Sequence, residues 1–226
     1  MYRQFFYLII LAVFIGSYGC SGLQVKRSVQ DNIFYSPASP KLQIKISPEY
    51  QYIGSTERSY HSGSEALSID TVSYTFVRVE DNAVKKGIII RINTLHSGIW
   101  LSRGKGDLVK WMKNKLETGD VTINGKSYDY GVQAFSRVFD KNTAHLITSK
   151  GYSISRCYML KALSRVTSYY REGEKIDIFY VEDASQFQGI RYRWKDWKSI
   201  DLLSANQKEF LKKYIERSLK DFQIMQ

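Results

Sequence analysis

Stretches in which apolar and polar residues alternate, joined by short turn sequences, constrain this chain more than any other feature. Residues 68–80 (SIDTVSYTFVRVE) alternate in this way, Asp81-Asn82 supplies a turn, and residues 87–95 (GIIIRINTL) return. Alternation with a period of two residues is typical of a strand with one buried face. We therefore expect an antiparallel hairpin across this turn.

Two further hairpins are predicted downstream. Asn124-Gly125 lies within residues 121–130, and this dipeptide favours the tight turn that joins two strands, so Val121 should lie opposite Tyr128. The segment Arg171-Glu172-Gly173-Glu174 predicts a third turn, with a strand leaving it over residues 175–182. The preceding residues 157–170 are compatible with either a strand or a helix.

Helical patterns occur in the middle and at the end of the chain. Residues 107–117 (DLVKWMKNKLE) have Asp107 as a candidate cap and Gly119 as a stop signal. Near the C-terminus, Ser204 and Gln207 form a capping-box pattern. It precedes a wide apolar stripe of Phe210, Leu211, Tyr214, Ile215, Leu219 and Phe222. We expect an α+β fold: a largely antiparallel sheet built from hairpins, with a mid-chain helix and a C-terminal amphipathic helix packed on it.

The domain organisation follows from the distribution of prolines and from chain length. The three prolines stand at positions 37, 40 and 48, so they punctuate only the entry to the chain. We expect a tether over residues 20–40 and a single α+β domain over residues 41–226. The 186 residues from Lys41 onward suffice for a substantial core.

The first twenty residues carry a basic start at Arg3, an apolar run of 11 residues from Phe5 to Ile15, and Gly19-Cys20. This arrangement resembles the signal peptides of bacterial lipoproteins, although Ser17 and Tyr18 depart from the usual lipobox. The resemblance implies a signal peptide over residues 1–19, after which Cys20 becomes the first mature residue and carries a thioether-linked diacylglycerol. It also implies a membrane-anchored location in the cell envelope, with the outer membrane favoured where the host has one. The alternative is an uncleaved N-terminal anchor, for which the run is short, since a spanning helix takes about 20 apolar residues.

Charge suggests the kind of partner. Loss of residues 1–19 removes one of 33 basic side chains and none of 22 acidic ones, so the mature chain has a net charge of +10. A basic surface attracts anionic lipid, lipopolysaccharide or wall polymer. Nucleic acid is not expected as a partner of an exported protein.

Catalytic and metal-binding signals are weak. His61, His96 and His145 are isolated, and no cysteine lies near them in a metal-ligand spacing, so no metal or other cofactor is predicted. If Cys20 is lipidated, Cys157 is left alone, and a lone cysteine in an apolar stretch is usually a buried small hydrophobe. Ser153, Cys157 and the histidines are the nameable candidates for an envelope hydrolase, which is the rival hypothesis.

The segment Arg191-Tyr192-Arg193-Trp194-Lys195-Asp196-Trp197-Lys198 combines cations with aromatic rings. Cations suit anionic headgroups, aromatic side chains suit the zone between water and lipid, and aromatic rings also stack on sugars. The candidate anionic-surface or glycan-binding residues are Arg191, Tyr192, Arg193, Trp194, Lys195, Trp197 and Lys198. The structural alternative is a half-buried edge strand with Lys and Arg on its wet side. The leading hypothesis is a lipid-anchored envelope protein that acts as a non-catalytic binding or assembly module.

Overall fold

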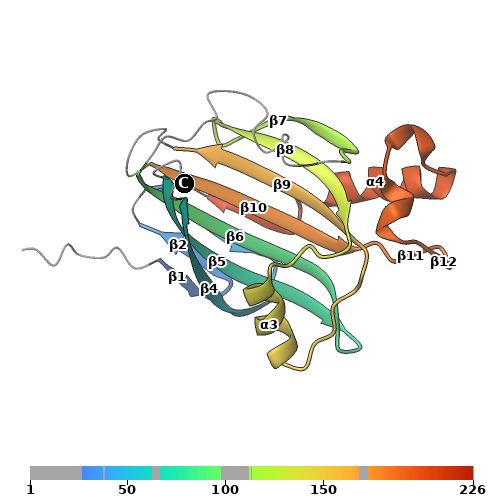
Figure 1. The fold of residues 1–226 in the computed structure, drawn as a ribbon, viewed down its shortest axis with the longest axis horizontal. Helices are drawn as coiled ribbons and strands as arrows, with labels where there is room; N and C mark the ends of the chain where they lie inside the picture. The colour runs from blue at the N-terminus through green and yellow to red at the C-terminus, as the bar shows by residue number, and fades with distance from the viewer. Residues whose placement is uncertain are drawn as a thin grey trace, which may run out of the picture.

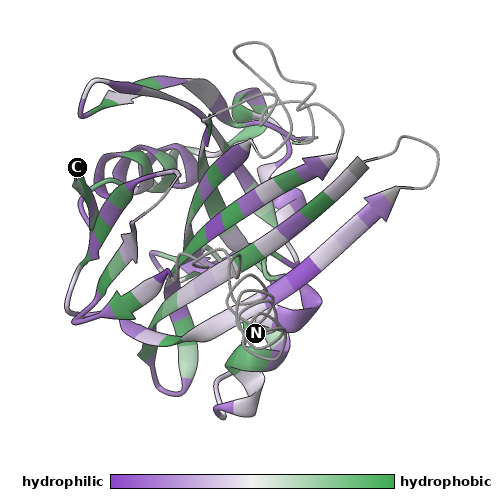
Figure 2. Ribbon diagram, turned by 90° about the vertical axis from the view of Figure 1, so that its left-hand side faces the viewer, coloured by the Kyte–Doolittle hydropathy of each residue, from purple (hydrophilic) through white to green (hydrophobic). Residues whose placement is uncertain are grey.

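A large antiparallel sheet organises the chain in the computed structural model, which describes residues 27–37, 39–62, 67–97, 112, 114–167 and 173–225. Its seven described strands lie in the order β4-β5-β6-β10-β9-β8-β7, and every neighbouring pair is antiparallel. Bands of apolar and polar residues alternate along these strands, as Figure 2 shows. The prediction of a largely antiparallel sheet is therefore confirmed.

Hairpins build most of this sheet, as the turn sequences predicted. β5 (Leu67–Glu80) and β6 (Ala83–Ser97) join through Asp81 and Asn82, whose φ angles are 52° and 57°. β7 (Glu117–Ile123) and β8 (Lys126–Phe135) join through Asn124-Gly125 and place Val121 opposite Tyr128. Positive φ at both turn residues is the requirement that Asn, Asp and Gly satisfy at low cost.

The third predicted hairpin is also present. β9 (Tyr158–Val166) pairs with β10 (Glu174–Asp183), so the helical alternative for residues 157–170 is wrong. Turn residues 171 and 172 lie outside the described part of the chain. β4 (Gln51–Ser62) completes the sheet at one edge, and β11 (Gln186–Phe187) and β12 (Ile190–Arg191) form a separate small ribbon.

A second sheet brings the two ends of the described chain together. It contains β1 (Ser28–Gln30), β2 (Ile33–Ser36), β3 (Leu42–Ile46) and β13 (Phe222–Met225), in that order. β1 and β2 lie within the segment that we expected to be a tether, and the side chain of Phe34 is fully buried. From Ser28 onward this segment is therefore part of the folded unit, because its apolar residues pair with β3 and pack on the large sheet.

The large sheet has a core on each face. On one face, Ile90 and Ile178 pack in a cluster with Ile44 of the small sheet and with Phe210 and Tyr214 of α4 (Ala205–Arg217). On the other face, α3 (Lys141–Ser149) contributes Ile147 to a second cluster. Figure 1 shows α3, α4 and the small-sheet strands around the large sheet.

The helices differ in part from the prediction. The capping box of Ser204 and Gln207 is confirmed, and α4 packs on the sheet, but the helix ends at Arg217. The prediction that Phe222 belongs to its apolar stripe is wrong, because Phe222 pairs with Ile46 in β13. α3 was not predicted; Asp140 caps it by accepting hydrogen bonds from the backbone N–H groups of Asn142 and Thr143.

The helix predicted over residues 107–117 falls mostly outside the described residues. Its described end is not helical, since Asn114 to Leu116 adopt no regular structure. Glu117 begins β7, and Gly119 pairs with Tyr130 inside that strand. The stop signal at Gly119 was therefore misread. Among the described residues, no helix has both the length and the apolar character needed to cross a membrane.

Candidate functional site

A groove of about 1010 Å³ lies at the end of the large sheet where β8 ends, β9 begins and β10 ends. We call it the basic groove. Its described lining comes from the β8–α3 loop, the first residues of α3, the segment before β9, the link between β10 and β11, and the segment after β12. The lining residues are Ser136, Arg137, Val138, Phe139, Lys141, Ala144, Ile154, Ser155, Arg156, Cys157, Ser185, Tyr192, Arg193, Trp194 and Lys195.

Short hydrogen bonds fix the wall that precedes β9. The hydroxyl of Tyr158 donates to the carbonyl of Val84 over 2.8 Å and accepts from the N–H of Ser155 over 3.0 Å. The N–H of Cys157 donates to the Ser155 hydroxyl over 3.3 Å. These bonds tie the loop that carries Arg156 to the sheet, so this cation starts from a defined backbone position.

The opposite wall is the segment that the sequence singled out. The N–H of Tyr192 donates to the carbonyl of Ser185 over 2.8 Å. Arg193 is the N-cap of η1 (Trp194–Trp197), and its N–H donates to the carboxylate of Asp196 in that turn over 2.6 Å. A side-chain bond of 2.8 Å from Gln207 to the carbonyl of Asp196 fastens this turn to α4.

Trp197 anchors the segment in the core. Its side chain is 1% exposed and lies with ring centroids 5.4 Å from Tyr192 and 5.5 Å from Phe210. The large apolar contact of an indole inside a core is sufficient to hold a four-residue turn in place. Trp197 therefore supports the groove wall and does not face a ligand.

The groove concentrates positive charge. Five of its described lining residues are cations, namely Arg137, Lys141, Arg156, Arg193 and Lys195, and none is acidic. In the described part of the chain, only Arg193 of these five has an ion-pair partner, Asp196 at 3.7 Å, and its side chain is 83% exposed. Four cations thus lie at one sheet end without a compensating carboxylate within 4.0 Å among the described residues. Such a group raises the local concentration of anions.

A smaller hollow of about 250 Å³ continues from the groove through Arg137, Val138 and Phe139. Arg91 lies in it, 3.3 Å from the Asp140 carboxylate, with its guanidinium 4.8 Å from the centre of the Phe179 ring. Burial lowers the pKa of Arg91, and the nearby charges of Asp177 and Asp140 act against that decrease. Since Asp140 also caps α3, the structure accounts for Arg91 as a support for the helix start.

The groove is poorly equipped for nucleophilic catalysis. Its described lining contains no histidine or carboxylate that could act as a base. Burial, together with the charges of Asp183 and Asp196, raises the pKa of Cys157 to about 12, so its reactive thiolate is scarce at neutral pH. His145 is exposed on α3 and does not belong to the lining.

Histidines gather at the opposite end of the sheet, without forming a relay. The Ser68 hydroxyl lies 2.9 Å from Nδ1 of His61, while the Asp70 carboxylate lies 2.7 Å from Nε2 of His96. No histidine in the described residues bonds both a serine hydroxyl and a carboxylate, as a serine hydrolase requires. Nor do the described residues contain a group of three or more potential metal ligands in a binding arrangement.

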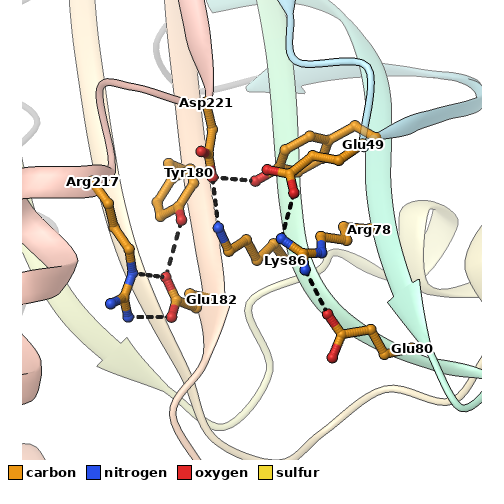
Figure 3. Close-up of polar contacts among 9 residues, drawn as sticks. Glu49, Arg78, Glu80, Lys86, Tyr180, Glu182, Arg217 and Asp221 are labelled. Carbon is orange, nitrogen blue, oxygen red and sulfur yellow. Dashed lines mark hydrogen bonds and ion pairs between the residues drawn. The ribbon is translucent and has the colours of Figure 1, made fainter.

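A third polar cluster, drawn in Figure 3, is a set of mutually satisfied charges. Arg217 forms a two-pronged ion pair with Glu182, which also accepts a hydrogen bond of 3.0 Å from the Tyr180 hydroxyl. Lys86 pairs with Asp221 over 2.9 Å. Because each charge here has a partner, the cluster joins α4 and β13 to the large sheet and offers no free charge to a ligand.

The predicted site residues separate into three groups. Tyr192, Arg193, Trp194 and Lys195 line the basic groove. Arg191 and Lys198 are exposed outside its lining, and Trp197 is in the core. The edge-strand interpretation of this segment is wrong beyond Arg191, because residues 194–197 form a turn of 3₁₀ helix.

Sequence reasoning missed the cations of the facing wall, Arg137, Lys141 and Arg156. Each is isolated in the sequence, and only the convergence of three strand ends brings them to the 192–195 segment. Cys20 and residues 1–19 lie outside the described residues. Comparison of the chain with known protein families, with curated proteins and with solved structures gives no match.

Proposed function

We propose that this chain is an exported, lipid-anchored envelope protein that binds an anionic ligand, without catalysis, in the basic groove. The observation that carries the proposal is the set of cations from three separate segments that meet in one hollow whose described lining has no acidic residue. Cations that share one hollow favour an anion that neutralises them. The apolar run from Phe5 to Ile15 and the Gly19-Cys20 junction support the anchor.

The groove is tested by removing three of its cations together. The variant Arg137→Gln/Arg156→Gln/Arg193→Gln should bind phosphatidylglycerol vesicles less tightly by about two orders of magnitude, at roughly 1 kcal/mol for each cation. The full chain, held in phosphatidylcholine nanodiscs, is titrated with these vesicles at several salt concentrations. The wild-type affinity should fall with salt, and the variant should show a shallower dependence.

A matched control removes the same net charge outside the groove lining. Arg191→Gln/Lys198→Gln/Lys220→Gln changes three exposed cations that do not line it. Equal losses in the two triple variants would show that net charge alone attracts the vesicles, and would reject the groove as the site.

The anchor has a separate test, the intact mass of the protein purified from a bacterial membrane fraction. A chain that begins at Cys20 and carries a lipid adduct is the expected result. A chain that retains residues 1–19, or that begins elsewhere, rejects the anchor and leaves the groove proposal intact.

A further inference from the structure

The residue types that line the basic groove indicate which class of anion it binds. We infer that the ligand is an anionic amphiphile: a headgroup with a phosphate that lies among the arginines, and an apolar part that lies on the groove floor. The inference rests on the proposed function and adds the class of ligand to it. Three observations carry it.

First, nearly half of the described lining is apolar or aromatic. Beside the five cations and three serines stand Val138, Phe139, Ala144, Ile154, Cys157, Tyr192 and Trp194. Phe139 and Cys157 are buried at 6% and 2% exposure, whereas Val138, Ala144 and Ile154 are half-buried, pack against the α3-face cluster that contains Phe139, and present the apolar surface of the floor. Contact with the methylene groups of a ligand removes this apolar surface from water and so stabilises the complex. A bare phosphate has no apolar part and provides no such stabilisation.

Second, the cations and the floor belong to the same segments. Arg137 precedes Val138 and Phe139, Ile154 precedes Arg156 by two residues, and Arg193 and Lys195 flank Trp194. A headgroup held by a guanidinium therefore has apolar surface within one or two residues on every wall. Arg suits phosphate because its planar fork donates two parallel hydrogen bonds to two phosphate oxygens.

Third, the lining is poor in acceptors. Arginine and lysine only donate hydrogen bonds, and the described lining includes no Asp, Glu, Asn, Gln or His. Four side-chain hydroxyls of the described lining can accept, those of Ser136, Ser155, Ser185 and Tyr192, and that of Ser155 already accepts from the N–H of Cys157. Each hydroxyl group of a glycan brings a donor as well as an acceptor, and four acceptors satisfy few such donors, so the lining favours a lipid headgroup over a phosphorylated polysaccharide.

The volume agrees with a ligand of this size. A groove of about 1010 Å³ is at the upper end of small-molecule sites, far larger than one phosphate requires. It accommodates a headgroup together with the first carbons of its chains.

The test uses soluble probes that separate charge from apolar contact. The full chain in phosphatidylcholine nanodiscs is titrated calorimetrically, against empty nanodiscs, with glycerol 3-phosphate and with dibutyryl, dihexanoyl and dioctanoyl phosphatidic acid below their aggregation limits. Dihexanoyl phosphatidylcholine tests the need for net charge, and a deacylated phosphorylated disaccharide tests the glycan alternative. We expect glycerol 3-phosphate to bind at least 100-fold more weakly than dihexanoyl phosphatidic acid, since each buried methylene adds up to about fourfold.

Variants locate the effect. Ile154→Ser should reduce the gain in affinity from dibutyryl to dioctanoyl phosphatidic acid, because it removes part of the apolar floor. Arg137→Gln/Arg156→Gln/Arg193→Gln should weaken every phosphatidic acid by a similar factor. Thermal melting of both variants checks that they fold, and the chain-length series on the wild type stands without them.

The outcomes separate the inference from the proposed function. If glycerol 3-phosphate or the phosphorylated disaccharide binds as tightly as dihexanoyl phosphatidic acid, the amphiphile inference is overturned and anion binding stands. If phosphatidylcholine binds equally well, or if no anionic probe binds, the proposed function fails too.

Discussion

The replacement Asp221→Asn should destabilise the protein, because this carboxylate fastens the last strand to the large sheet. Asp221 directly precedes β13 and accepts from the Tyr50 hydroxyl over 2.7 Å and from the Lys86 ammonium over 2.9 Å, the second contact being visible in Figure 3. The side chains of Lys86 and Asp221 are 17% and 13% exposed, so water screens this pair only in part.

The magnitude follows from what asparagine keeps and what it loses. Its amide oxygen still accepts from Tyr50, but as a neutral acceptor, and the ammonium of Lys86 loses its counter-charge. A hydrogen bond to a charged group contributes about 1.5–3 kcal/mol, so we expect the free energy of unfolding to fall by about 2–3 kcal/mol. For a protein of this size the melting temperature should fall by roughly 5–10 °C.

The effect should depend on pH in a defined direction. Burial acts to raise the pKa of Asp221, but the hydrogen bonds of Tyr50 and Lys86 and the charge of Lys86 outweigh it, and the pKa lies below its ordinary value. A carboxyl whose folded-state pKa is depressed stabilises the fold above its unfolded pKa, and this stabilisation is lost as the pH falls through the folded pKa. The difference between wild type and Asp221→Asn should therefore be full near pH 7 and shrink below about pH 4.

Urea denaturation followed by circular dichroism measures this difference at pH 7 and at pH 3.5. Asp201→Asn is the matched control, since Asp201 is exposed and has no ion pair within the described structure. A double-mutant cycle with Lys86→Met isolates the pair itself. A loss below about 0.5 kcal/mol, or an equal loss at both pH values, would refute the reasoning.

Two further predictions concern the core. In Gly87→Ala the new Cβ would lie 2.8 Å from a methyl carbon of Val181 on the paired strand β10. The free energy of unfolding, measured by denaturant titration, should therefore fall by about 1–3 kcal/mol. An unchanged denaturation midpoint would contradict this packing. Cys157 should resist iodoacetamide at pH 8 in the folded protein, because its thiol is buried and burial raises its pKa to about 12. In urea the same thiol should react quickly. Mass spectrometry detects the adduct, and rapid labelling of the folded chain would refute the burial of Cys157.

What the sequence predicted correctly depends on local chemistry. The turns at Asp81-Asn82 and Asn124-Gly125 are set by residues that tolerate positive φ, and the start of α4 is set by a reciprocal bond between Ser204 and Gln207. Each of these signals lies within four residues. Alternation then fixes the register, since a shift of one residue would expose the apolar face.

The elements that were predicted wrongly depend on partners far away in the chain. Phe222 continues the helical spacing of the apolar stripe, yet it pairs with Ile46, which lies far away in the chain. β2 follows Asp31-Asn32, whose φ angles of 50° and 57° resemble those of the Asp81-Asn82 turn, so its pairing with β1 had a local signal that the prediction of a tether overlooked. Its pairing with β3 depends on a partner farther along the chain. Helix α3 has only Thr143 and Ile147 buried, too sparse a stripe for the apolar period to reveal.

The candidate site shows the same division. The 192–195 wall was visible because its cations and rings are consecutive, but the alternation that suggested a strand was overridden by the Asp196 cap and by burial of Trp197. The other wall is carried by Arg137 and Arg156, which are 19 positions apart and separated by α3. Their meeting follows from where β8 ends and β9 begins, which is a property of the sheet order and not of any local pattern.

The sheet also sets the distance between the proposed anchor and the proposed binding site. Arg27, the first described residue, bonds Glu174 at the start of β10, whereas the groove lies beyond the other end of that strand. In Figure 1, β1 and the small ribbon of β11 and β12 accordingly lie at opposite sides. A strand of ten residues spans about 34 Å, while the seven steps from Cys20 to Arg27 reach at most about 25 Å. If the proposed anchor holds and β10 stands along the membrane normal, the groove lies farther from the anchoring bilayer than Arg27 does. The proposed ligand would then reach the groove as a single molecule or from a facing membrane.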